Sequence, residues 1–203
     1  MKEMMEQFNS HISTASSSEE EAEYEKEICR INDAFVFEVL TVVPPPLEYL
    51  SKLHTKQQEI SGRMVWCGSL LLSTFLLTET TSIILPRTNS PRRILELGSG
   101  SGIVGMTVAQ ILSSSSSNTT GIAICLTDGD EMAINLLEQN MVNNQIQSTI
   151  CNAKLLLWGE DKNQEFDNWC IQKWPNVFCK SDVTFDLILA GDVLYKKSLI
   201  PLL

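Results

Sequence analysis

The sequence has few of the residues that bind zinc. It holds only two histidines, His11 and His54, and its six cysteines stand at irregular spacings without a CxxC pair. A structural zinc site needs four such ligands in a closely spaced set, so we expect no metal site. Most of the cysteines lie in apolar segments, which predicts reduced thiols in the core. Neither histidine has neighbours that indicate catalysis.

A concentration of basic residues is also lacking. The net charge is -10, and residues 1–27 carry -6 of it, with eight Glu against two Lys. Surfaces that bind nucleic acid need clustered Lys and Arg to neutralise phosphates. The composition therefore disfavours a nucleic-acid partner.

Long hydrophobic runs are absent as well. The longest apolar stretch, Met64 to Leu77, is too short and too rich in Ser and Thr to span a bilayer. The N-terminal residues lack the continuous apolar region of a secretory signal. We therefore expect no membrane association and a cytoplasmic, possibly nuclear, location.

Composition divides the chain into three parts. Residues 1–27 are polar and acidic, which predicts a disordered tail. Residues 28–90 contain a strand-like stretch at 31–40, a proline-rich turn and an apolar, helix-like stretch at 67–77. We expect this part to form an N-terminal cap. Residues 91–203 contain the main domain.

Strands and helices alternate through the main domain. Short apolar runs predict strands, and apolar residues at helical spacing predict the helices between them. The predicted strands are 92–97, 122–127, 150–158 and 185–190, and the predicted helices are 102–112 and 130–143. This alternation predicts an α/β fold, a doubly wound and mostly parallel sheet with right-handed crossovers.

The first strand of this domain runs into four glycines. In such a sheet the ligand lies beyond the carboxyl ends of the central strands, and glycines let it approach the main chain. Gly100, Gly102 and Gly105 match the GxGxxG dinucleotide fingerprint, which is weak evidence by itself. Glu96 lies two residues before Gly98, where a carboxylate would repel a pyrophosphate and attract a cation.

The stretch ELGSGSG resembles motif I of the class I methyltransferases, which use S-adenosylmethionine (SAM). Three more stretches resemble the seven-β-strand protein lysine methyltransferases grouped as family 16. They are Gly62 to Trp66 (GxxxW), Trp158-Gly159, and Asp192 to Tyr195 (DxxY), in the order of that family. The resemblance covers Phe35 to Leu203. It implies the Rossmann-like class I fold, SAM as the cofactor, and methylation of a lysine in a protein partner.

Asp128 ends the second strand of the domain. SAM and NAD enzymes both place an acid there to accept hydrogen bonds from ribose hydroxyls, so Asp128 indicates an adenosine ligand without choosing between them. The alternative role is a helix N-cap, for which Asp130 is also available.

The resemblance implies a role for each motif. It assigns cofactor contacts to Trp66, Glu96, Gly98, Gly100, Gly102, Asp128, Trp158 and Ala190, and catalytic roles to Asp192 and Tyr195. A carboxylate favours a charged amine, so Asp192 is expected to position the lysine and not to act as a general base. Two alternatives stay open: core packing for each tryptophan, and capping of a helix near Lys196 for Asp192.

The chain ends at Leu203, within the helix expected after the fourth strand. The class I fold has strand order 3-2-1-4-5-7-6, and only the first four strands are legible. We therefore expect a truncated isoform or a fragment, monomeric, with an exposed fourth strand that risks pairing or aggregation. A non-catalytic interaction module remains an alternative. An NAD-dependent oxidoreductase is less favoured, since no Tyr-x-x-x-Lys relay is recognisable.

Overall fold

The computed structural model describes residues 24–42, 61–79, 83–84, 91–115, 119–159, 163–179 and 183–193. Most of the expected N-terminal tail, the proline-rich turn and Tyr195 lie outside these ranges.

Four parallel strands form the central sheet, in the order β5-β4-β3-β6. They are β3 (Arg92–Leu97), β4 (Ile122–Asp128), β5 (Cys151–Leu155) and β6 (Leu187–Ala190). Counted along the domain this order is 3-2-1-4, so the predicted doubly wound arrangement is confirmed. All of β4 except its last residue is buried, as expected of a parallel strand that is covered on both faces.

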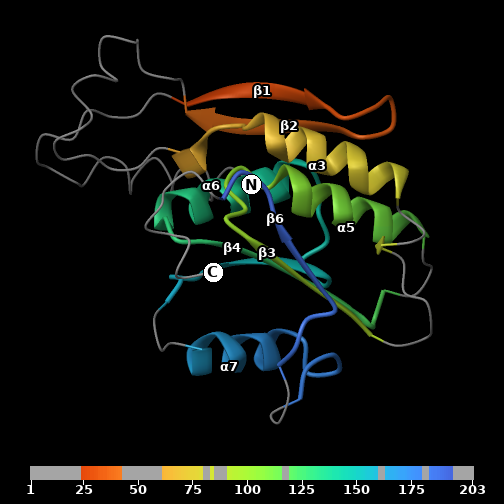
Figure 1. Ribbon diagram of the computed structural model, residues 1–203, viewed down its shortest axis with the longest axis vertical. Coiled ribbons are helices and arrows are strands. Elements are labelled where there is room, and N and C mark those ends of the chain that lie inside the picture. The colour runs from red at the N-terminus through yellow and green to blue at the C-terminus, as the bar shows by residue number, and fades with distance from the viewer. Residues whose placement is uncertain are drawn as a thin grey trace, which may run out of the picture.

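Helices cover both faces of the sheet (Figure 1). One face carries α3 (Cys67–Thr78), α5 (Ile103–Ser115) and α6 (Glu131–Asn143), and the other carries α7 (Asn163–Lys173). All but α7 match the predicted ranges to within three residues at each end. The start of α6 is set by Asp130, whose side chain accepts a hydrogen bond from Met132 N at 2.9 Å.

Helix α7 has no counterpart among the predicted elements. Phe166, Cys170 and Trp174 recur every four residues and pack against Leu95 and Cys125 of the sheet. This spacing is a helical signal. It is weak because polar residues outnumber apolar ones in the helix.

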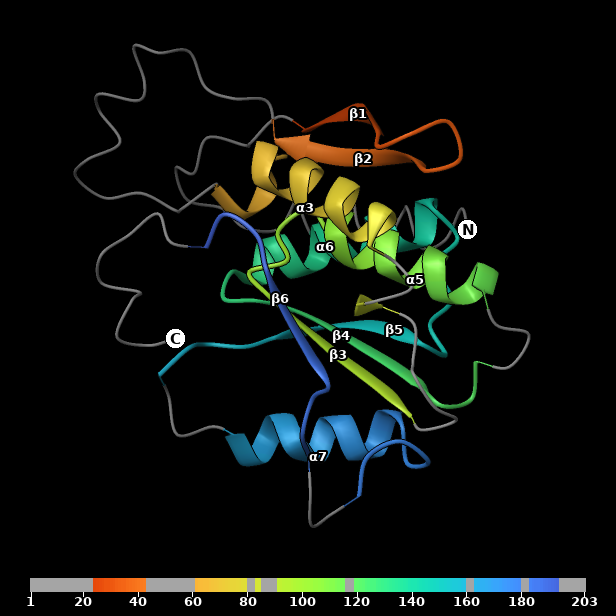
Figure 2. The same ribbon diagram turned by 45° about the vertical axis from the view of Figure 1, so that its right-hand side comes forward.

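An antiparallel hairpin precedes the α/β domain. Its strands are β1 (Tyr24–Arg30) and β2 (Val36–Val42). It lies on the outer side of the helical layer, away from the sheet (Figures 1 and 2). Residues 24–27 therefore belong to a strand, which corrects the expected end of the tail at residue 27. Their composition is polar, but they are ordered by pairing with β2, whose Phe37 and Val39 are fully buried.

Strand β6 pairs only with β3 among the described residues, and its Ile188 is 58% exposed. The expectation of an exposed fourth strand is confirmed for this part of the chain.

Four of the six cysteines are buried, as predicted, while Cys67 and Cys179 are exposed. None of the described helices is long and apolar enough to cross a membrane. Within the described ranges, no three His, Cys, Asp or Glu side chains gather in a way that would hold a metal ion.

Candidate active site

A cleft of about 740 Å³ lies at the carboxyl ends of β3, β4 and β6. It is lined by residues 61–64 with Trp66 and Ser69, residues 98–101, residues 128–130 with Met132, residues 156–158, and residues 191–193. Each of the last four segments follows a different strand, and in a parallel sheet these strand ends meet at one edge. Gly62, Trp158 and Asp192, one from each of the three family-like motifs, all reach this cleft.

The turn from β3 into α5 forms one wall of the cleft. Gly98 and Gly100 line it, as predicted, with φ angles of 63° and 52°. A Cβ at position 100 would lie 3.0 Å from the carbonyl oxygen of Gly62. Glycine is therefore needed here for both its φ angle and the close approach of the segment that carries Gly62.

Gly102, also predicted to contact the cofactor, does not line the cleft. Its φ angle is 89°, and a Cβ there would collide with Cδ1 of Leu137 on α6. Its lack of a side chain allows α6 to pack against the start of α5.

Asp128 holds the glycine turn against the end of β4. Its Oδ2 accepts a hydrogen bond from Gly100 N and its Oδ1 accepts one from Asp130 N, each at 3.0 Å. Burial raises the pKa of Asp128, while the amides of Asp130 and Gly100 oppose that shift. The alternative role of Asp128 as the N-cap of α6 is excluded, since Asp130 occupies that position. Asp128 lines the cleft.

Glu96 does not line the cleft. It shares a face of β3 with Ile94, and its Oε2 lies 2.7 Å from the position of a Cβ on Gly105 of α5. Its side chain is buried, and burial raises its pKa to about 8; Ser99 and the Gly105 amide favour the charged form, while the charge of Asp128 opposes it. This shift favours the protonated form of Glu96. The expected negative charge at the ligand is not supplied, because Glu96 faces the helix and is desolvated.

Trp66 and Trp158 both line the cleft. Trp66 is 45% exposed, and its Nε1 donates a hydrogen bond to Ser61 O at 2.7 Å. This exposure argues against core packing for Trp66. Trp158 is half-buried, with its ring 3.8 Å from the position of a Cβ on Gly98.

Asp192 follows β6, which pairs with β3 on the side away from β4. Its side chain is exposed, and its Oδ2 accepts a hydrogen bond from Gly68 N at 2.7 Å. Asp192 therefore caps α3, a role that differs from the expected alternative of capping a helix near Lys196. Lys196 and Tyr195 lie outside the described residues. Ala190 is exposed and does not line the cleft, although the next three residues do.

Arg63 was not predicted. It is 2% exposed, and its Nε lies 3.4 Å from Oδ2 of Asp130. Its Nη1 donates to the hydroxyl of Tyr24 on β1 at 3.5 Å. Both Arg63 and Asp130 line the cleft; their ion pair joins residues 61–63 to the start of α6, and the bond to Tyr24 joins the hairpin to Arg63. The only feature of the sequence that could have pointed to Arg63 as a site residue is its position inside the GxxxW stretch, Gly62 to Trp66.

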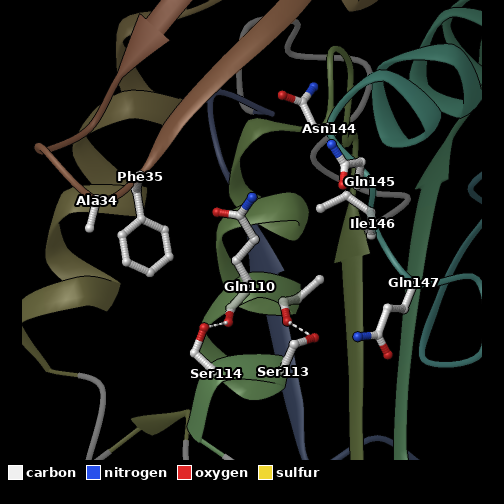
Figure 3. Close-up of a pocket in the computed structure, with 10 residues that line it drawn as sticks. Ala34, Phe35, Gln110, Ser113, Ser114, Asn144, Gln145, Ile146 and Gln147 are labelled. Atoms are coloured by element: carbon white, nitrogen blue, oxygen red, sulfur yellow. Dashed lines mark hydrogen bonds between the residues drawn. The ribbon is translucent and has the colours of Figure 1, made fainter.

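A second cleft of about 380 Å³ lies between the tip of the hairpin, α5 and the turn after α6 (Figure 3). The hydroxyls of Ser113 and Ser114 there are bonded to main-chain oxygens of their own helix. No predicted site residue lines this cleft, so we place the candidate active site in the larger one.

A parallel α/β sheet with a glycine turn after its first strand and an acid after its second defines a domain that binds a nucleotide-like cofactor. A family model described as lysine methyltransferase matches residues 49–203. The chain belongs to this lysine methyltransferase family, and the resemblance seen in its sequence motifs is confirmed.

Similar proteins include the protein-lysine N-methyltransferase EFM6 of Saccharomyces cerevisiae, 30% identical over 148 residues. The alignment covers 70% of this chain and 55% of EFM6, so the chain spans about half the length of this relative.

Two solved structures are also similar. The tRNA (uracil-54, C5)-methyltransferase of Pyrococcus abyssi, in complex with S-adenosyl-L-homocysteine, has a TM-score of 0.33 and 17% identity, over 66% of this chain and 24% of that chain. A SAM-dependent methyltransferase from Agrobacterium tumefaciens has a TM-score of 0.46 and 14% identity. The match covers 85% of this chain and 41% of that chain. At these TM-scores the assignment rests on the family match.

Proposed function

We propose that this protein transfers a methyl group from SAM to the side chain of a lysine in another protein. Its membership of the lysine methyltransferase family supports the class of reaction. The observation that carries the site assignment is the 3.0 Å hydrogen bond from Gly100 N to the carboxylate of Asp128. This bond joins the glycine turn and the acid after β4 on one wall of the cleft, where both are able to contact one ligand.

The residues of the cleft fit SAM. The cleft volume of about 740 Å³ falls within the usual range for ligand pockets, roughly 300–1,000 Å³. Gly98 and Gly100 leave main chain uncovered for the methionine part, and the Asp128 carboxylate has about four lone-pair sites, one more than its backbone partners Gly100, Gly129 and Asp130 use, which leaves one for a ribose hydroxyl. Trp66 and Trp158 offer aromatic faces to the cofactor; such stacking contributes about 1–3 kcal/mol per base in nucleic-acid sites. Glu96 and Ala190 have no direct contact in this proposal.

SAM supplies a methyl group bonded to a positively charged sulfur. Transfer to a lysine would form a nitrogen–carbon bond as the carbon–sulfur bond breaks, so the lysine nitrogen would need a lone pair. The unperturbed pKa of lysine is about 10.4, so the amine loses its proton to water before transfer. The main task of the chain is to align the amine, and such alignment contributes about 7–11 kcal/mol in well-oriented reactions.

Asp192 is the residue we assign to this alignment. One of its oxygens caps α3 and its side chain is exposed at the cleft, which leaves the other oxygen for the lysine amine. Because a carboxylate favours the charged amine, Asp192 positions the acceptor and does not remove its proton. Tyr195 belongs to the same proposal through the DxxY resemblance. We further propose that this protein is a monomer and that it acts in the cytoplasm or the nucleus.

Calorimetric titration of the chain with SAM, S-adenosylhomocysteine and NAD tests the cofactor. We expect the first two to bind and NAD not to bind. Gly100→Arg should abolish binding, whereas Gly121→Arg, at the other end of β4, should not; a Cβ there meets only Pro91 Cα, at 3.6 Å. Binding of NAD alone, or equal binding by Gly100→Arg, would overturn the site assignment.

Labelled SAM tests the acceptor. Incubated with a proteome extract and this chain, it should label lysine side chains of one or a few proteins, as read by mass spectrometry. The Gly100→Arg variant is the control for background labelling. Label on other side chains, or no label above that background, would contradict lysine methylation by this chain.

A further inference from the structure

Asn140 of α6 and Asn144, the C-cap of that helix, hold the edge of β2 that is not paired with β1. Asn144 accepts from Glu38 N at 2.9 Å and donates to Glu38 O at 2.7 Å. Asn140 accepts from Leu40 N at 2.7 Å and donates to Leu40 O at 3.2 Å. The two spacings match, since four residues of helix rise about 6 Å and two residues of strand about 6.8 Å. These two carboxamides thus satisfy the hydrogen-bonding groups of the strand edge as a neighbouring strand would.

Asn140 makes one more contact, and it reaches the glycine turn. Its Nδ2 donates to Ser101 O at 3.0 Å. Ser101 follows Gly100 in the glycine turn and lines the proposed cofactor cleft. Asn140 is fully buried, and its single acceptor and both of its donors are used. Asn144 has no such bond to the turn; its remaining contact is the carbonyl of Asn140.

The hairpin also supports the facing wall of the cleft. Thr41 of β2 donates a hydrogen bond from its buried hydroxyl to Arg63 O at 3.0 Å, in the 3-10 helix η1 (Ser61–Arg63). Residues 61–64 form the wall that approaches Gly100. Strand β2 is therefore joined to both walls, through Asn140 on one side and Thr41 on the other.

We propose that Asn140 is a positioning residue for SAM, which holds the glycine turn to the N-terminal hairpin and makes the hairpin part of the cofactor site. This inference rests on the proposed function. The carbonyl of Ser101 is held by a buried donor, so the main chain of residues 98–101 keeps its shape before a ligand arrives.

The test compares Asn140→Ala with Asn144→Ala in the full chain. Both variants lose a bidentate contact with β2, but only Asn140→Ala loses the bond to Ser101. We expect the affinity for S-adenosylhomocysteine to fall about five- to tenfold in Asn140→Ala, because binding must then order a glycine turn that Asn140 no longer holds, and to stay within about twofold in Asn144→Ala. A merely structural role would lower the stability of both variants and leave the affinity of the folded protein unchanged.

Hydrogen exchange supplies a readout without ligand. In Asn140→Ala the Gly102 amide, bonded to Ser99 O at 2.9 Å, should exchange faster, and in Asn144→Ala it should not. Asn140→Ser adds no charge to the core, and its hydroxyl can bond a carbonyl of its own helix, so it is the second variant if Asn140→Ala does not fold. The proposal would be overturned if the Asn140 and Asn144 variants changed affinity and exchange equally. It would also be overturned if the Asn140 variant kept the affinity and the Gly102 exchange rate of the wild type. Failure of the wild type to bind SAM would instead count against the proposed function, because the exchange comparison stands without it.

Discussion

The carboxylate of Asp192 accepts a hydrogen bond from the backbone amide of Gly68 at 2.7 Å, although the two residues are 124 positions apart in the chain. Asp192 adopts a φ angle of 55°, an uncommon conformation for a residue other than glycine. A Cβ on Gly68 would collide with the Asp192 carboxylate. The contact therefore joins the end of β6 to the first turn of α3, which begins next to Trp66.

Substitutions of Asp192 should separate its two roles. Asp192→Ala removes the cap of α3, and we expect it to lower the free energy of unfolding by about 0.5–2 kcal/mol. Asp192→Asn keeps an oxygen acceptor and tolerates the positive φ angle, so its stability should stay close to that of the wild type. If the charge positions lysine, methyl transfer should still fall in Asp192→Asn. Urea unfolding and a methyl-transfer assay measure the two effects, and equal losses of stability in both variants would contradict the capping role.

Burial of Glu96 should make stability depend on pH. The folded protein holds this proton up to a pKa of about 8, whereas the ordinary value is 4.5. Between these values the folded state binds more protons than the unfolded state, so the free energy of unfolding should fall as pH rises, by at most about 1.4 kcal/mol per unit from this group. Glu96→Gln should remove this slope and be the more stable protein at pH 8. Urea unfolding at pH 5, 6, 7 and 8 measures the difference, and parallel curves for the two proteins would show that Glu96 is not the group responsible.

Asp128 should be coupled to the ribose of the ligand. Asp128→Ala should weaken binding of S-adenosylhomocysteine by roughly tenfold or more, since it removes a charged acceptor for a ribose hydroxyl and the acceptor of Gly100 N. A 2′-deoxyribose analogue should bind wild type more weakly than S-adenosylhomocysteine does, but the two ligands should bind Asp128→Ala alike. Comparing two ligands in two proteins is a double-mutant type of cycle, and it separates the contact between Asp128 and the 2′-hydroxyl from the change in the glycine turn. An equal loss for the analogue in both proteins would rule out a contact between Asp128 and the 2′-hydroxyl.

The grouping of Trp158 and Asp192 in one cleft was predictable from the sequence. Both lie just beyond the carboxyl ends of strands, and parallel topology brings such ends to one edge. The side-chain direction of Glu96 was predictable in principle, because Ile94 shares its face of β3 and is buried in the core. The partners of Asp192 and Asn140 were not, since Gly68 and Ser101 lie 124 and 39 residues away and no local pattern pairs them.

The sequence by itself determined the alternation of strands and helices, and with it the edge of the sheet where the cleft lies, because apolar spacing is a local property of the chain. Only the tertiary structure decided that Glu96 is desolvated, that Asp192 caps α3, and that Asn140 joins the hairpin to the glycine turn. Burial and hydrogen-bond partners depend on which distant segments come together, and they set the charge and position of these groups.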